Sequence, residues 1–178
     1  MKPFFLPLFA LLCATFSVQA QPFTQPAAAT TAPKGAGMLA ANATVTNGIL
    51  TLSLKSNGGD FTAWTHVFID LGPAAKPSYN HSSGAPAGNG LEILFEGTQA
   101  YRFTGDSPTV WSWAPLSGVT VERTVAGDTL TLKTPLASLG LPPGGTVKIF
   151  AATYTENYAD TLDTLPREMR SWSFTVPR

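Results

Sequence analysis

The strongest apolar runs of the chain lie near its middle, at residues 64–71 and 90–97. A polar loop at 72–89, rich in Gly, Pro, Ser and Asn, separates them. Successive side chains of an extended segment point to opposite faces, and both faces of the first run are mostly apolar. We therefore expect residues 64–71 to form a central strand that is covered on both sides.

Shorter strand patterns recur on either side of this centre. Asn47-Gly48 separates two extended segments and predicts a type I′ hairpin, because both positions tolerate a positive φ. In the second arm Leu50, Leu52 and Leu54 share one face. Further strands are expected at 101–103, 111–113, 119–123, 129–133, 147–155 and 171–176, with one helical turn in 135–141 and a polar connection at 157–170. About nine strands with little helix predict an all-β fold, a two-sheet antiparallel β-sandwich of jelly-roll or Ig-like type.

The beginning of the chain has the organisation of an export signal. Residues 1–20 combine a basic start, an apolar run and a small-residue cleavage site of the A-x-A type at Val18-Gln19-Ala20. Residues 21–36, rich in Ala, Thr and Pro, show no hydrophobic period and are expected to be a flexible linker. Residues 37–178 then form one binding domain of ordinary size. The predicted location is secreted, periplasmic or extracellular.

Charge and cysteine content limit the kinds of ligand and partner that the mature chain is expected to bind. Without residues 1–20, ten basic residues face eleven acidic ones, a net charge of about −1 with both histidines neutral. Scattered, nearly balanced charges give no electrostatic footprint for nucleic acid or an anionic membrane. The single cysteine, Cys13, lies inside the expected signal, so the mature chain is expected to have no disulfide and no cysteine metal site.

The order of motifs in the middle of the chain is similar to a known group of secreted domains. His66-Val67-Phe68-Ile69-Asp70, a Gly-rich loop, Gly90-Leu91-Glu92-Ile93-Leu94-Phe95-Glu96, Tyr101-Arg102-Phe103, Trp111-Ser112-Trp113 and Thr134-Pro135-Leu136-Ala137-Ser138-Leu139-Gly140 follow one another. This pattern resembles the DOMON and family 9 carbohydrate-binding-module group of β-sandwiches. The chain departs from it at Gly90-Leu91 and at Leu71, where acidic residues are frequent in the group. The resemblance implies a non-catalytic domain that binds carbohydrate or, in some members, b-type haem.

Carbohydrate binding needs flat aromatic faces with polar side chains at the rim. Trp64 and Trp172 are expected to fill the sandwich core. The main candidates for the ligand site are Trp111, Trp113 and Tyr101 as faces, with Glu92, Arg102 and His81 as polar contacts. Asn80 could supply a further polar contact. The expected partner is carbohydrate or a cell-surface polysaccharide. A structural or self-assembling protein of the cell surface is the alternative.

Cofactor and metal sites have weaker support. Axial haem ligands could come from His66, His81, Met38 or Met169. His66 is expected in a central strand and His81 in an exposed loop. Calcium could bind Asp60 with Asn57, or Asp160 with Asp163, but acids in such loops more often cap turns. We predict no cofactor and no metal.

Enzyme chemistry has few candidate residues. Glu92 and Glu96 share one side of an expected strand and lie roughly 13 Å apart at ~3.3 Å per residue. Glycosidase carboxylates are ~5–9.5 Å apart. The sequence contains no G-x-S-x-G, H-E-x-x-H or phosphate-binding loop. We therefore expect a binding protein and no enzyme.

Overall fold

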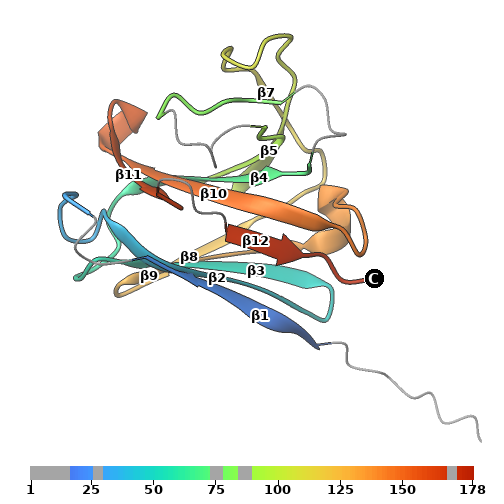
Figure 1. Ribbon diagram of the computed structural model, residues 1–178, viewed down its shortest axis with the longest axis horizontal. Coiled ribbons are helices and arrows are strands. Elements are labelled where there is room, and N and C mark those ends of the chain that lie inside the picture. Colours follow the sequence, from blue (N-terminus) through green and yellow to red (C-terminus); the bar gives the residue numbers. More distant parts are fainter. Residues whose placement is uncertain (1–16, 26–29, 73–77, 84–89, 168–171) are drawn as a thin grey trace, which may run out of the picture.

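The computed structural model describes residues 17–25, 30–72, 78–83, 90–167 and 172–178. Two antiparallel sheets pack face to face, which confirms the predicted all-β sandwich (Figure 1). The five-stranded sheet has the order β1-β2-β3-β9-β8, with β1 Ser17–Thr24, β2 Met38–Thr46, β3 Ile49–Ser56, β9 Thr129–Pro135 and β8 Glu122–Ala126. The seven-stranded sheet has the order β11-β10-β4-β5-β6-β7, with β12 also paired to β10. Its strands are β11 Thr161–Leu165, β10 Thr146–Tyr154, β4 Trp64–Asp70, β5 Ile93–Glu96, β6 Gln99–Phe103, β7 Trp113–Pro115 and β12 Trp172–Thr175.

The main core fills the space between the two sheets. Leu50, Leu52 and Leu54 of β3 point into it, as the alternation along that strand predicts, and Val67 and Ile69 of β4 face them. Trp172, Phe174 and Val176 close the core from the C-terminal segment. Burial of these side chains is the main driving force for joining the two sheets.

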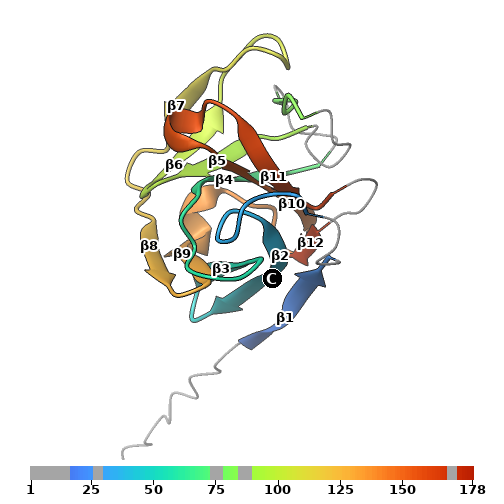
Figure 2. The same ribbon diagram turned by 90° about the vertical axis from the view of Figure 1, so that its left-hand side faces the viewer.

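A second apolar cluster covers the opposite face of the seven-stranded sheet. Phe68, Leu94 and Phe150 lie at its centre and are fully buried. The segments 78–83 and 103–113 lie over them, on the far side of β4 and β5 from β3 and β9 (Figure 2). The prediction that β4 is a central strand covered on both sides is therefore confirmed.

Two of the expected turns have the predicted backbone. Asn47 and Gly48, with φ of 51° and 75°, connect β2 to β3 as a two-residue hairpin. The helical turn expected near residue 137 is the 3₁₀-helix η3, Leu136–Leu139, which Gly140 ends in the left-handed conformation.

Twelve strands occur among the described residues, where about nine were expected. Part of the expected linker is ordered: Gln21–Thr24 belong to β1 and pair with β2, and Gln25 is buried. The polar connection expected at 157–170 contains β11. Backbone pairing to an existing strand stabilises both segments, and an amphipathicity pattern does not record such pairing.

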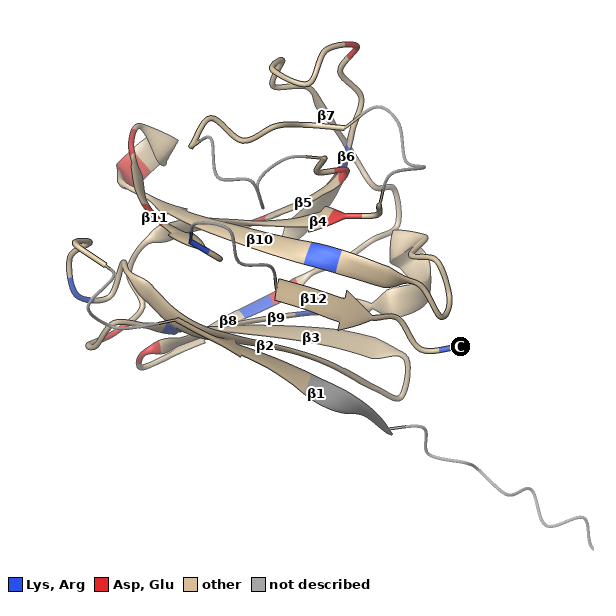
Figure 3. Cartoon of the chain, viewed as in Figure 1, with Lys and Arg blue, Asp and Glu red and all other residues tan. Residues whose placement is uncertain are grey.

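The charged residues of the described part of the chain are scattered over both sheets and their loops (Figure 3). In the described part of the chain no helix has both the length and the apolarity to cross a membrane. The expected signal peptide falls mainly on residues 1–16, outside the described residues, and stays a prediction.

One buried ion pair ties β11 to the start of β2. The Asp163 carboxylate binds the Arg167 guanidinium and accepts the backbone N–H of Met38 at 2.6 Å. Arg167 also donates to the carbonyl of Met38 at 3.0 Å. The pair connects the two sheets at the edge where β11 approaches β2.

Removing one partner of this pair leaves a charge without compensation. We expect Asp163→Ala to lower the free energy of unfolding by about 3–5 kcal/mol. Glu122→Gln is the control, because the Lys133–Glu122 pair is exposed and its loss costs less than about 1 kcal/mol. Urea unfolding followed by circular dichroism measures both. Equal losses in the two variants would contradict the structural role of Asp163.

Candidate functional site

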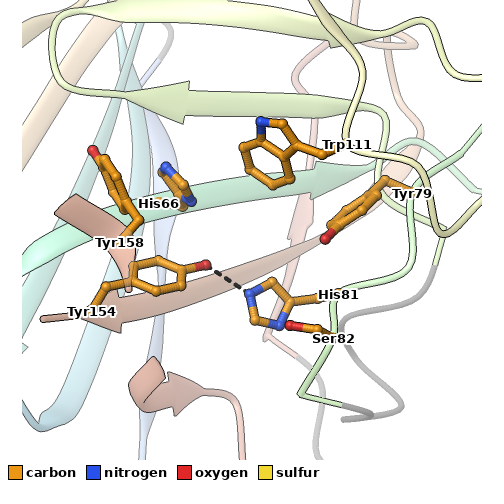
Figure 4. A pocket seen from close by; sticks show the side chains of 7 residues that line it. All are labelled: His66, Tyr79, His81, Ser82, Trp111, Tyr154 and Tyr158. Carbon is orange, nitrogen blue, oxygen red and sulfur yellow. Dashed lines mark hydrogen bonds between the residues drawn. The ribbon is translucent and has the colours of Figure 1, made fainter. Parts of the chain in front are cut away.

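A pocket of about 230 Å³ opens over the outer face of the seven-stranded sheet. His66 projects from β4, Tyr154 from β10 and Tyr158 from the short 3₁₀-helix η4, Glu156–Tyr158. The segment 78–83 and the loop before β7 complete the wall (Figure 4). The lining residues are His66, Tyr79, His81, Ser82, Trp111, Tyr154 and Tyr158. None of the lining side chains is an acid, a lysine or an arginine.

His66 is the most constrained polar side chain of the pocket. Its ring stacks on Tyr158, with centroids 4.2 Å apart and planes 14° apart, and on Trp111 at 5.3 Å and 26°. The residue is 3% exposed, yet neither Nδ1 nor Nε2 has a hydrogen-bond partner among the described residues. The nearest carboxylate oxygen, on Glu96, is 3.7 Å from Nε2. Burial, together with the nearby His81, lowers the pKa of His66 to about 3, so the ring is neutral at pH 7.

His81 is buried, at 4% exposure, so the expectation of an exposed loop position was wrong. Its Nδ1 accepts the backbone N–H of Ser83 at 3.1 Å. A neutral imidazole whose Nδ1 accepts carries its proton on Nε2, which then donates to the Tyr154 hydroxyl at 2.7 Å. The Tyr154 hydroxyl therefore has its own proton to donate to an acceptor in the pocket. Burial lowers the pKa of His81 to about 4 and raises the pKa of Tyr154.

Backbone strain places Tyr158 on His66. Asn157 and Tyr158 both have positive φ, 59° and 58°. A bulky side chain in this region costs on the order of 1–2 kcal/mol, and such outliers cluster at functional sites. The stacked ring of Tyr158 forms one wall of the pocket as a result.

Trp111 forms the rim. It is 51% exposed, although its indole contacts His66 on one face. Tyr79 and Trp113 meet it in edge-to-face arrangements, at centroid distances of 5.3 Å and 5.6 Å. These contacts fix the orientation of a largely exposed aromatic ring.

The six residues expected at the ligand site do not gather at one place. Trp111 and His81 line the pocket, and Trp113 lies half-buried against Trp111. Tyr101 is half-buried in the same outer cluster, and its hydroxyl donates to Gln99.

Glu92 and Arg102 are outside the pocket lining. The Glu92 carboxylate accepts the backbone N–H of Leu71 at 2.7 Å, and Arg102 donates to the carbonyl of Leu139 at 3.1 Å. Asn80, the further candidate for a polar contact, accepts the backbone N–H of Gly90. These three polar side chains thus hydrogen-bond the backbone and do not line the His66 pocket. Their expected contact with a ligand stays a prediction.

Five lining residues were not among the expected ligand-site residues: His66, Tyr79, Ser82, Tyr154 and Tyr158. A signal for two of them existed in the alternation, since His66 shares a strand face with Phe68, and Tyr154 shares one with Phe150 and Ala152.

Trp64 is 42% exposed, so its assignment to the core was wrong, whereas Trp172 is buried there as expected.

The candidate haem ligands are dispersed. Met38 is buried in the main core and Met169 lies outside the described residues. Both ring nitrogens of His81 are engaged, which leaves His66 as the one candidate with free nitrogens among the described residues.

The candidate calcium residues make contacts within the protein. Asn57 accepts from Gly35 and donates to Ala32, and Asp163 binds Arg167. No three His, Cys, Asp or Glu side chains of the described ranges are grouped so as to hold a metal ion.

No protein-family profile, curated protein or solved structure matches this chain. The resemblance to the DOMON and family 9 carbohydrate-binding group therefore stays a prediction.

The buried titratable groups predict how stability depends on pH. His66 and His81 bind protons in the unfolded chain below about pH 6.5 but stay neutral when folded, so each one lowers stability as the pH falls. Glu92 acts in the opposite direction, because burial raises its pKa from 4.5 to about 7 and the folded state holds the proton. As the pH falls from 6 to 5, the two histidines lower the free energy of unfolding and Glu92 alone raises it, which leaves the net effect of one histidine. The free energy of unfolding should fall by about 1.4 kcal/mol per pH unit.

Glu92→Gln should make this slope about twice as steep, because it removes the opposing group. Glu122→Gln, on an exposed strand, should leave it unchanged. Urea titrations at pH 6 and pH 5 measure the difference for all three proteins. A flat wild-type profile, or an unchanged slope in Glu92→Gln, would show that these groups are not buried as described.

Proposed function

We propose that this protein is an exported, non-catalytic binding module whose pocket holds one sugar ring. The observation that carries the proposal is His66, a buried imidazole without a hydrogen-bond partner among the described residues, beside the exposed indole of Trp111. A buried polar group without a partner costs about 1–3 kcal/mol. A ligand that supplies the missing hydrogen bond recovers that cost on binding.

The chemistry of the lining suits a polyol. A sugar ring presents an apolar face, which can lie on an exposed aromatic ring such as Trp111. Its hydroxyls both donate and accept hydrogen bonds. One hydroxyl can donate to a nitrogen of His66 while a neighbouring oxygen accepts from Tyr154. A purely apolar ligand would leave both protein groups unsatisfied.

Two alternatives have less support. Haem would have to be ligated by His66, since the nitrogens of His81 are already bound to Ser83 and Tyr154. Assembly through the sandwich faces would not account for a polar side chain held without a partner at the centre of an aromatic pocket.

Trp111→Ala should weaken sugar binding about tenfold, because the stacking surface is lost. The measurement is a titration of the mature protein with a panel of mono- and oligosaccharides, followed by calorimetry or tryptophan fluorescence. Val110→Ala is the matched control: the residue is next in sequence and 45% exposed, but does not line the pocket. A flat response to the whole panel, or equal effects of the two variants, would refute the site.

His66→Phe separates binding from stability. The variant keeps an aromatic ring between Tyr158 and Trp111 but removes both unpartnered nitrogens. We expect two- to tenfold weaker sugar binding, the effect of one hydrogen bond, with stability at pH 7 unchanged or increased. If the variant instead bound sugar as well as wild type, His66 would have no role in recognition.

A further inference from the structure

The aromatic row that forms the pocket continues beyond it. Trp64 meets Tyr158 edge to face, with centroids 4.8 Å apart. Tyr158 in turn stacks on His66, and His66 stacks on Trp111. Trp64 and Trp111 are the two exposed ends of this row, and Tyr158 and His66 lie between them. The row therefore extends past the His66 pocket, which Trp64 does not line.

A second cavity of about 290 Å³ lies at the Trp64 end. Its lining residues are Thr62, Ala63, Trp64, Thr65, Gly97, Arg123 and Tyr158. Tyr158 lines both cavities and is the wall between them. A chain of two or more sugar rings could therefore occupy both cavities across this one side chain.

Arg123 is the one charged residue that lines the second cavity. It projects from β8 of the five-stranded sheet, is exposed, and makes no ion pair or hydrogen bond with another described residue. Lys55, Lys133, Lys148 and Arg167 each pair with a carboxylate. A guanidinium presents a planar set of donors that matches a carboxylate in two parallel hydrogen bonds.

The negative charge nearest to the row lies beside its two middle rings, His66 and Tyr158. The Glu96 carboxylate is 3.7 Å from His66 and does not line the second cavity. Burial and Glu96 together raise the pKa of Tyr158 to about 12, whereas Arg123 acts on Tyr158 in the opposite direction. Of the two cavities, the one lined by Arg123 is therefore the more favourable place for an anionic group.

We propose that the second cavity is a subsite for a sugar ring that carries a carboxylate, so that the ligand of this protein is an acidic oligosaccharide containing a uronic acid. The proposal rests on the proposed function, since the first pocket holds the neighbouring ring. Trp64 and Tyr158 contact the ring, and Arg123 binds its carboxylate.

The test compares each acidic oligosaccharide with its own methyl ester, which has the same rings without the charge. The probes are oligogalacturonate, alginate oligosaccharides and hyaluronan oligosaccharides, titrated by calorimetry at 20–50 mM and at about 500 mM salt. We expect at least one acid to bind about tenfold more tightly than its ester at low salt, and the difference to shrink at high salt because the pair is exposed to solvent. Arg123→Gln should abolish the difference. Trp64→Ala should weaken acid and ester alike.

Lys133→Gln is the control, because this cation lies on the adjacent strand β9 and is paired with Glu122. It should leave the preference for the acid intact. Equal binding of acids and esters, or a preference that survives in Arg123→Gln, would overturn the second subsite.

The two proposals fail in different ways. If Trp111→Ala and His66→Phe weaken the esters while Arg123→Gln changes nothing, the sugar pocket stands and the acidic subsite is refuted. If only Arg123→Gln matters, the acidic site stands and the pocket at His66 is refuted. Failure of every probe to bind would refute both.

Discussion

Burial of β4 on both of its faces is the constraint that connects the fold of this protein to its candidate site. Val67 and Ile69 point between the sheets, while His66 and Phe68 point to the outer cluster. Because the side-chain period of a strand is two, the register that buries the aliphatic pair also fixes the histidine on the outer face. The imidazole cannot turn to solvent without breaking the pairing of β4 with β5 and β10.

The outer cluster differs from the main core in what its burial costs. The main core is almost entirely apolar, whereas the pocket wall holds two imidazoles and three phenols. Neutral imidazoles with depressed pKa values, an unpartnered polar ring and a tyrosine in a left-handed conformation all oppose folding. The sandwich core must offset these terms. Their concentration at one cavity, beside an exposed tryptophan, is what favours a ligand site over an ordinary packed surface.

The β-sandwich could be predicted from the sequence, but only part of the candidate site could. Alternation along β3 and β4 and the Asn47-Gly48 turn depend on neighbouring residues, so they could be predicted. The pocket depends on register between distant strands: Tyr154 reaches it because β10 pairs antiparallel with β4, placing Ala152 opposite His66 and Tyr154 opposite Trp64. Burial of His81 depends on how segment 78–83 folds over the sheet. Such tertiary placements leave no periodic signal along the chain.

Charge placement extends the same argument to the whole row of aromatic rings. The seven-stranded sheet and its loops supply the aromatic rings and Glu96. Arg123, at the Trp64 end of the row, comes from β8 of the five-stranded sheet. Packing of the two sheets therefore sets the separation between the Glu96 carboxylate and the Arg123 guanidinium. Aromatic stacking is nearly indifferent to the direction of a sugar chain, whereas a carboxylate group distinguishes the two ends. An acidic ligand would be held in one orientation, with a carboxylate of its ring in the second cavity directed toward Arg123.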